Sequence, residues 1–333
     1  MGLAAGGMGR MILTVSPNTS TDRVYVVSGF RPGATMRSHL SFDQAGGSGA
    51  HVSGVVGQLG GESRALVVLG GGNGLRWRAA AARQGIDYRA VEIDVENRSS
   101  VVVVDRQLGL VAEIVDGGPR LGGREHEALL ELLRRELPAA SLLVLSGSLP
   151  AGMPQDLYFS AIEVARGHGV RVIIDAHSEP MEAALGARPW MVKVNLEEFG
   201  GLMGGYPRDM AERVGAAQEF AARHGIEVLL LSMAQEGAVL AYGGHAWHLP
   251  VPPVPSHLPG SEGINPVGCG DAMVGAFAWA YERTGDVLEA ARWGVAAAHV
   301  NLAKYEVPSC PLPEVEAVLS FVETRMVAQE EKV

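Results

Sequence analysis

The chain has 333 residues, 47% of them hydrophobic, and a formal net charge of −10 at pH 7. This length and apolar content are typical of one large globular domain, and the acidic balance argues against nucleic-acid binding, which needs a basic surface. The sequence holds two cysteines and no apolar run of about 18 residues, so it predicts neither a disulfide framework nor a membrane-spanning helix.

The first nine residues are small and rich in glycine, and the first basic residue is Arg10. This segment lacks the basic start and the apolar core of a signal peptide. We therefore expect a disordered tail over 1–9 and a single domain over 11–329, in a cytoplasmic protein.

Short apolar runs alternate along the chain with amphipathic segments of helical length, as in βαβ units. The predicted strands cover 11–16, 64–69, 142–145, 170–175, 190–194 and 228–232, with one or two more within 237–254. The predicted helices cover about 45–59, 74–84, 124–136, 155–168, 179–186, 208–224, 271–284, 286–302 and 313–329. The fold class is therefore α/β, with a central, mostly parallel sheet and helices on both of its faces.

Two segments, 22–43 and 86–116, are rich in β-branched residues and interrupt this alternation. We expect them to pair into a small second sheet, which we call the lid. An exposed sheet of this kind either covers a site or is buried against another subunit, so we also expect a homodimer formed through the lid.

The clearest chemical signal is the segment Asn265–Met273, in which two glycines flank Cys269 and Asp271 opens an apolar helix. Glycine lets the backbone approach a ligand, and a helix N-terminus offers unpaired N–H groups to an anion. A carboxylate there can take a proton from an attacking hydroxyl while the amides stabilise a transferred phosphoryl group. Alternatively, Asp271 only stabilises the first turn of the helix.

A second signal is the segment Lys193–Glu198, where a predicted strand ends and a helix begins. Ligands bind at that edge of an open α/β sheet. Asn195 and Glu198 are three residues apart, and Glu198 can hold a hydrated Mg²⁺ through water. The alternative is a capping box, in which the same two side chains only satisfy the first turn.

A third signal is the Gly-rich segment Asp43–His51, which precedes a helix. It offers backbone close to a small polar ligand, or else it is only a tight turn. Ser48 nearly fits a G-x-S-x-G elbow, but Ala50 takes the place of the last glycine.

Other enzyme classes lack their motifs in this sequence. There is no Gly-Lys-Ser/Thr of a P-loop, and Gly70–Gly74 lacks the spacing of a dinucleotide-binding fingerprint. The histidines and cysteines are scattered without zinc-ligand spacing.

Taken together and in this order, the three segments resemble the signatures of the PfkB (ribokinase-like) carbohydrate kinases. Two more stretches, Ser16–Asp22 and Leu145–Pro154, resemble the branch of 1-phosphofructokinases, minor-type 6-phosphofructokinases and tagatose-6-phosphate kinases. The resemblance spans roughly 11–320. It implies a ribokinase-like three-layer sandwich with a β-sheet lid. It also implies ATP-dependent phosphoryl transfer to a hydroxyl of fructose 1-phosphate, fructose 6-phosphate or tagatose 6-phosphate.

The resemblance also implies a role for each matching residue. Asp271 is the expected general base, and the backbone of Gly268, Cys269 and Gly270 is the expected anion hole. The residues expected to bind Mg·ATP are Lys193, Asn195, Glu198, Ser232 and Gly237, with Glu198 holding Mg²⁺ through water. The residues expected to bind the sugar are Asp22, Gly46, Gly47 and His51, with Arg98 and Arg37 on the phosphate that the substrate already carries.

The sequence departs from the family pattern at several of these positions. Ser48 and His51 stand where Gly-Gly-Lys-Gly-x-Asn has Lys and Asn, and His51 changes the donors and acceptors offered to a sugar. Ala234 replaces a usual Gly, and the loop 255–263 is long for the family. Two alternatives therefore stay open: a kinase of an unphosphorylated sugar or nucleoside, and a non-catalytic sugar- or nucleotide-binding relative.

Overall fold

The structure, a computed structural model, describes residues 11–253 and 264–327. The predicted tail over 1–9 and the loop 255–263 lie outside the described residues.

A ten-stranded sheet crosses the molecule in the order β14-β13-β12-β11-β10-β9-β8-β1-β4-β5. Its strands are parallel from β5 to β11, and the last three pair antiparallel. The strands of this sheet are β1 Met11–Ser16, β4 Ser63–Leu69, β5 Tyr88–Glu92, β8 Ala140–Ser146, β9 Arg171–Asp175, β10 Met191–Asn195, β11 Val228–Ser232, β12 Ala238–Tyr242, β13 His245–Leu249 and β14 Arg325–Met326.

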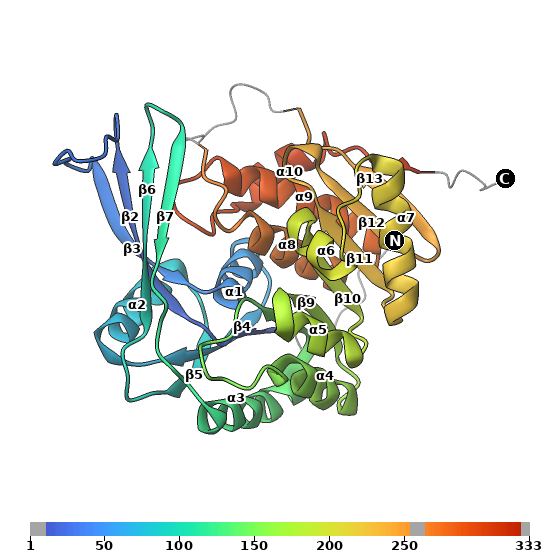
Figure 1. The fold of residues 1–333 in the computed structure, drawn as a ribbon, viewed down its shortest axis with the longest axis horizontal. Helices are drawn as coiled ribbons and strands as arrows, with labels where there is room; N and C mark the ends of the chain where they lie inside the picture. The colour runs from blue at the N-terminus through green and yellow to red at the C-terminus, as the bar shows by residue number, and fades with distance from the viewer. Residues whose placement is uncertain (1–10, 254–263, 328–333) are drawn as a thin grey trace.

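Helices cover both faces of the sheet, which confirms the expected three layers (Figure 1). Along β8, Leu143 and Leu145 pack on one face while Leu142 and Val144 pack on the other, because successive side chains of a strand alternate. One face carries α3 Gly123–Glu136, α4 Leu157–Gly167, α5 Ser178–Gly186, α6 Leu196–Met203 and α7 Met210–His224. The other carries α1 Ser48–Gln58, α8 Cys269–Thr284, α9 Val287–Leu302 and α10 Leu312–Leu319.

The helix α2, Gly71–Gln84, packs beside β4 through the buried ring of Trp77. Two short 3₁₀ helices, η1 Leu137–Ala139 and η2 Ala234–Glu236, complete the described helical segments.

The lid is a separate four-stranded sheet in the order β3-β2-β6-β7, and it stands at the upper left of Figure 1. Its strands are β2 Ser20–Val27, β3 Leu40–Gly46, β6 Arg98–Asp105 and β7 Leu110–Val115. Valines on its inner face, among them Val24 and Val102, pack around Tyr305 of the segment after α9. The two β-rich segments therefore pair with each other as expected.

Two secondary-structure expectations need correction. The segment 86–116 divides between the sheets, because β5 pairs in parallel with β4 and only β6 and β7 belong to the lid. The helix predicted over 313–329 ends at Leu319, since the guanidinium of Arg292 donates to the carbonyls of Leu319 and Val322, and the chain then pairs with β13.

Candidate active site

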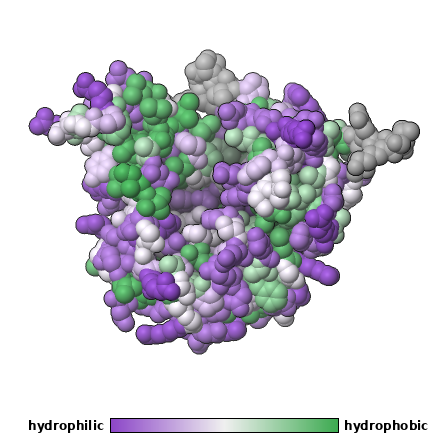
Figure 2. All heavy atoms as spheres, in the orientation of Figure 1, coloured by the Kyte–Doolittle hydropathy of each residue, from purple (hydrophilic) through white to green (hydrophobic). Residues whose placement is uncertain are grey.

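A pocket of about 250 Å³ opens at the carboxyl ends of the parallel strands. Ser16, Ser146 and Asp175, which end β1, β8 and β9, all line it. Figure 2 shows the surface hollowed between the lid and the helical body. The predicted site residues that line the pocket are Arg98, Lys193, Glu198, Gly268, Gly270 and Asp271.

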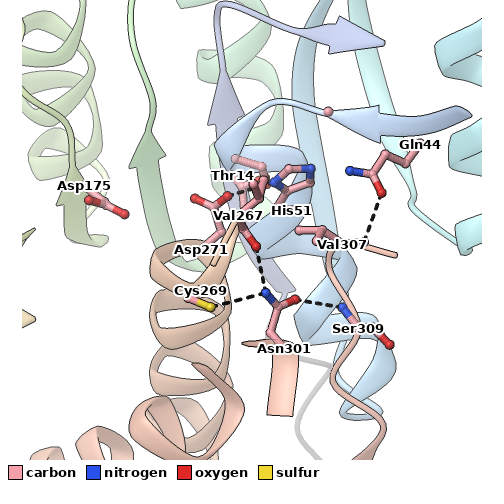
Figure 3. Close-up of polar contacts among 12 residues, drawn as sticks. Thr14, Gln44, His51, Asp175, Val267, Cys269, Asp271, Asn301, Val307 and Ser309 are labelled. Atoms are coloured by element: carbon pink, nitrogen blue, oxygen red, sulfur yellow. Dashed lines mark hydrogen bonds and ion pairs between the residues drawn. The ribbon is translucent and has the colours of Figure 1, made fainter. Parts of the chain in front are cut away.

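Asp271 lies in the first turn of α8, which begins directly after Gly268. Gly268 has φ 72°, and a Cβ there would lie 2.2 Å from the Val307 side chain, so only glycine fits. Asn301, fully buried on α9, donates to the carbonyl of Val267 (2.9 Å) and accepts from the amide of Ser309 (3.1 Å) (Figure 3). These bonds fix the backbone that leads into the helix.

His51 contacts Asp271 directly, with 2.8 Å between Nδ1 and Oδ2 (Figure 3). The sequence predicted His51 as a sugar-binding residue and did not predict this pair. Burial of the ring disfavours its charged form, but the hydrogen bond and the charge of Asp271 prevail and raise the pKa of His51.

Lys193 of β10 and Asp175 of β9 form a second buried pair, with Nζ at 3.1 and 3.3 Å from the two carboxylate oxygens. Burial, together with the charges of Asp271 and Glu198, raises the pKa of Asp175 to about 6, although the ammonium of Lys193 opposes the shift. The same carboxylates raise the pKa of Lys193 despite its burial. Lys193 is therefore positively charged in the pocket at neutral pH.

Asn195 and Glu198 form the capping box that was the structural alternative to a nucleotide role. The side-chain oxygen of Asn195 accepts a hydrogen bond from the backbone N–H of Glu198 (2.9 Å). In return, the carboxylate of Glu198 accepts one from the backbone N–H of Asn195 (2.8 Å). Glu198 also lines the pocket, so its second oxygen can bind a hydrated cation as well.

The segments Ser16–Asp22 and Leu145–Pro154 meet at the pocket. The side-chain amide of Asn18 donates to the hydroxyl of Ser148 (3.0 Å), and the guanidinium of Arg98 donates from Nε to the carbonyl of Asn18 (3.1 Å). Arg98 thus enters the cleft from the lid, and its role on a substrate phosphate stays a prediction.

On the lid side of the site, Asp22 is buried, and its Oδ1 has no hydrogen-bond partner among the described residues. A Cβ on Gly46 would lie 2.1 Å from Oδ2 of Asp22, so glycine is required for this approach. Gly47 is the N-cap of α1. Because Oδ1 of Asp22 is a buried acceptor with no partner among the described residues, it is suited to accept a hydrogen bond from a ligand hydroxyl.

Nine predicted site residues lie outside this lining. His51, Asn195, Asp22, Gly46 and Gly47 are described above, and four remain. Arg37 is exposed in the connection between β2 and β3. Ser232 pairs in register with Asn195, and Gly237 precedes β12, both farther along the sheet edge. The amide of Cys269 donates to the carbonyl of Pro266 (3.3 Å), and burial raises the pKa of its thiol to about 11.

Sequence reasoning missed Asp175 and Asn301 as well as the His51–Asp271 contact. Asp175 was visible as the polar end of an apolar strand, at the same sheet edge as Asn195. Asn301 was visible as a polar residue within the apolar helix predicted over 286–302.

Within the described residues, no helix is long and apolar enough to cross a membrane. Across the same ranges, no group of three or more His, Cys, Asp and Glu side chains is arranged to hold a metal ion. The described residues of the pocket therefore hold no cluster of side chains that would coordinate a metal ion by themselves.

The sequence matches the model of the pfkB family of carbohydrate kinases over residues 18–314. It is 32% identical to 1-phosphofructokinase of Xanthomonas campestris pv. campestris, over 81% of this chain and 84% of the relative. It is 29% identical to ATP-dependent 6-phosphofructokinase isozyme 2 of Mycobacterium tuberculosis, over 92% of this chain and 88% of the relative.

The fold is similar to the crystal structure of phosphofructokinase-2 from Escherichia coli in complex with potassium, with a TM-score of 0.84 and 26% identity, over 94% of this chain and 99% of that chain. The fold is therefore ribokinase-like. The chain belongs to the pfkB family of carbohydrate kinases and is an ATP-dependent carbohydrate kinase.

Proposed function

We propose that this kinase transfers the γ-phosphoryl group of ATP to a hydroxyl of fructose 1-phosphate, fructose 6-phosphate or tagatose 6-phosphate, with Asp271 as the general base. The observation that carries the proposal is the position of Asp271, which opens α8 and lines a pocket that also holds the cations Arg98 and Lys193. A base, an anion-binding helix start and two cations are the parts that phosphoryl transfer needs.

In the reaction, the carboxylate of Asp271 accepts the proton of the acceptor hydroxyl as that oxygen attacks the γ-phosphorus. The backbone at Gly268 and Gly270 lines the pocket at the start of α8, where N–H groups and the helix dipole favour the negative charge of the transferred group. Lys193 adds a fixed positive charge beside the nucleotide phosphates. Cys269 contributes packing, because its thiol lies near Asn301 and Asn265.

Glu198 is the residue proposed to hold Mg²⁺, through water, with Asn195 fixing its carboxylate. A water-mediated site fits the described residues, since one Glu198 oxygen already accepts a backbone N–H bond. When bound, the ion neutralises the negative charge of the ATP phosphates. Ser232 and Gly237 extend the proposed nucleotide site along the sheet edge toward the antiparallel strands.

Arg98 favours a phosphorylated acceptor over a free sugar or nucleoside. Its side chain lines the pocket, and a guanidinium fork suits a phosphate. Asp22, Gly46 and Gly47 supply the proposed sugar contacts on the same side. Arg37, exposed on the loop between β2 and β3, is a weaker candidate for this phosphate than Arg98.

A screen of ATP consumption tests the substrate. The acceptors are the three ketohexose phosphates, their free sugars, ribose and nucleosides, each at equal concentration. Turnover with one or more ketohexose phosphates and little with the free compounds is expected. A preference for a free sugar or a nucleoside would contradict the proposal, and no turnover with any acceptor would favour the non-catalytic alternative.

A homodimer formed through the lid is proposed for the assembly. The outer face of the lid carries the exposed apolar side chains Leu110 and Ile114, with Tyr25, Val101 and Val103 partly buried beside them. Figure 2 shows hydrophobic residues gathered over this region. Contiguous apolar surface on a two-faced sheet is typical of a face that another subunit covers.

A further inference from the structure

The contact between His51 and Asp271 joins two helices that are distant in sequence. His51 lies in the first turn of α1, its side chain is 6% exposed, and its Nδ1 is 2.8 Å from Oδ2 of Asp271. The two residues are 220 positions apart, and they meet because α1 packs against α8. The packing of α1 against α8 therefore forms the pair, and Asp271 is its member that lines the pocket.

A carboxylate that acts as a base needs one oxygen directed at the proton it removes. The bond to His51 uses Oδ2 of Asp271 and so leaves Oδ1 for the acceptor hydroxyl. The bond also resists rotation of the carboxylate group about its terminal torsion, which is otherwise broad.

We propose that His51 is a positioning residue for Asp271, in which Nδ1–H donates to Oδ2 and thereby holds Oδ1 toward the acceptor hydroxyl. This role rests on the proposed function, because it requires Asp271 to be the base.

The charges around the ring support this arrangement. Burial favours the neutral imidazole, but Asp271 on α8, and beyond it Asp22 on β2 and Glu113 on β7, face the ring with negative charge and raise the pKa of His51. In the protonated state the bond to Asp271 is charge-assisted and stronger than a neutral one. The ammonium of Lys193 on β10 adds a positive charge that interacts with Asp271.

The second ring nitrogen is free for another donor or acceptor. Nε2 of His51 is buried and has no hydrogen-bond partner among the described residues. Among the described residues, the hydrogen bond at Nδ1 is therefore the one that orients the imidazole ring.

The proton and electron balance of the step is unchanged by His51. Oδ1 of Asp271 takes the proton of the acceptor hydroxyl while the hydroxyl oxygen forms its bond to the γ-phosphorus. The bond between that phosphorus and the bridging oxygen of ATP breaks, and ADP leaves with the electron pair. His51 keeps the protons it held.

Two substitutions of His51 distinguish the contribution of Nδ1 from that of Nε2. In His51→Asn the amide occupies the region of Nδ1 and can still donate to Asp271, whereas in His51→Gln the amide occupies the region of Nε2. We expect His51→Gln to lower kcat by about tenfold to a hundredfold with little change in the KM for ATP, as for a lost hydrogen bond to a charged group. His51→Asn is expected to recover most of that loss.

A titration that does not depend on turnover provides the second readout. The ring of His51 is followed by NMR in protein labelled at histidine, and its signal is assigned by its disappearance in His51→Gln. Its pKa is expected above the ordinary value of 6.5 in the wild-type protein and lower in Asp271→Asn, where the carboxylate charge is gone.

Equal kcat in wild type, His51→Asn and His51→Gln would overturn the positioning role, and so would identical titration of His51 in wild type and Asp271→Asn. Absence of any turnover in the wild-type protein would instead overturn the proposed function, and this role with it.

Discussion

Replacing Lys193 by methionine tests the buried charge pair at the base of the pocket. The ammonium is the cation that faces Asp175 at 3.1 and 3.3 Å, and both side chains are at most 10% exposed. Without it, the Asp175 carboxylate stays buried beside the negative charges of Asp271 and Glu198. Removing one partner of a buried ion pair costs about 3–5 kcal/mol, so we expect a loss of that order in the free energy of unfolding at pH 8.

The loss is expected to shrink as the pH falls. The pKa of Asp175 is about 6 in the folded protein and 3.8 as the ordinary value, so the folded state binds the proton first. Protonation of Asp175 therefore increases the free energy of unfolding as the pH falls through about 6. Loss of the Lys193 ammonium raises the pKa of Asp175 further, because that ammonium favours the charged carboxylate. In Lys193→Met, Asp175 can thus become neutral under milder acidity than in the wild-type protein.

The assay is urea unfolding followed by tryptophan fluorescence at pH 8 and pH 5.5. Asp175→Asn and the double variant Lys193→Met/Asp175→Asn complete a double-mutant cycle. The double variant is expected to be more stable than Lys193→Met, because no unpaired charge remains. A loss below about 1 kcal/mol at pH 8, or strictly additive losses in the cycle, would refute the reasoning.

Three further predictions concern the acceptor and the lid. Arg98→Ala is expected to raise the KM for ketohexose phosphates by about tenfold to a hundredfold in steady-state kinetics, and an equal rise for free sugars would contradict a phosphate role. Gly46→Ala places a Cβ 2.1 Å from Oδ2 of Asp22, so the acceptor KM is expected to rise by at least about tenfold with the KM for ATP unchanged; unchanged acceptor binding would exclude Asp22 from the sugar site. Ile114→Glu places a charge on the outer face of the lid and is expected to convert a dimer to a monomer in light scattering, whereas Leu75→Glu, exposed on α2, serves as the matched control. A wild-type monomer would contradict the lid interface.

Local sequence predicted the parts of the site that lie within one segment. The glycines before Asp271 and the strand end at Asn195 are short-range patterns, because a helix start and a sheet edge are each built from neighbouring residues. The α/β fold followed from the alternation of apolar runs. The structure confirms that class and the three layers.

The contacts that the sequence did not predict join distant segments. His51 meets Asp271 across 220 positions, and Lys193 meets Asp175 across neighbouring parallel strands. The strand β5 was assigned to the wrong sheet, because a short β-rich run does not reveal which edge it pairs with. The end of α10 depends on Arg292 of another helix, which no local pattern contains.

The central claim is that Asp271 is the general base, and Asp271→Asn tests it most directly. The amide keeps the shape of the side chain and, with Lys193 intact, the variant is expected to fold and to bind ATP. Its kcat for the best acceptor in the ATP-consumption screen is expected to fall by about 10²–10⁴, the contribution of a positioned base. A kcat within about threefold of the wild-type value, with ATP binding retained, would contradict the account.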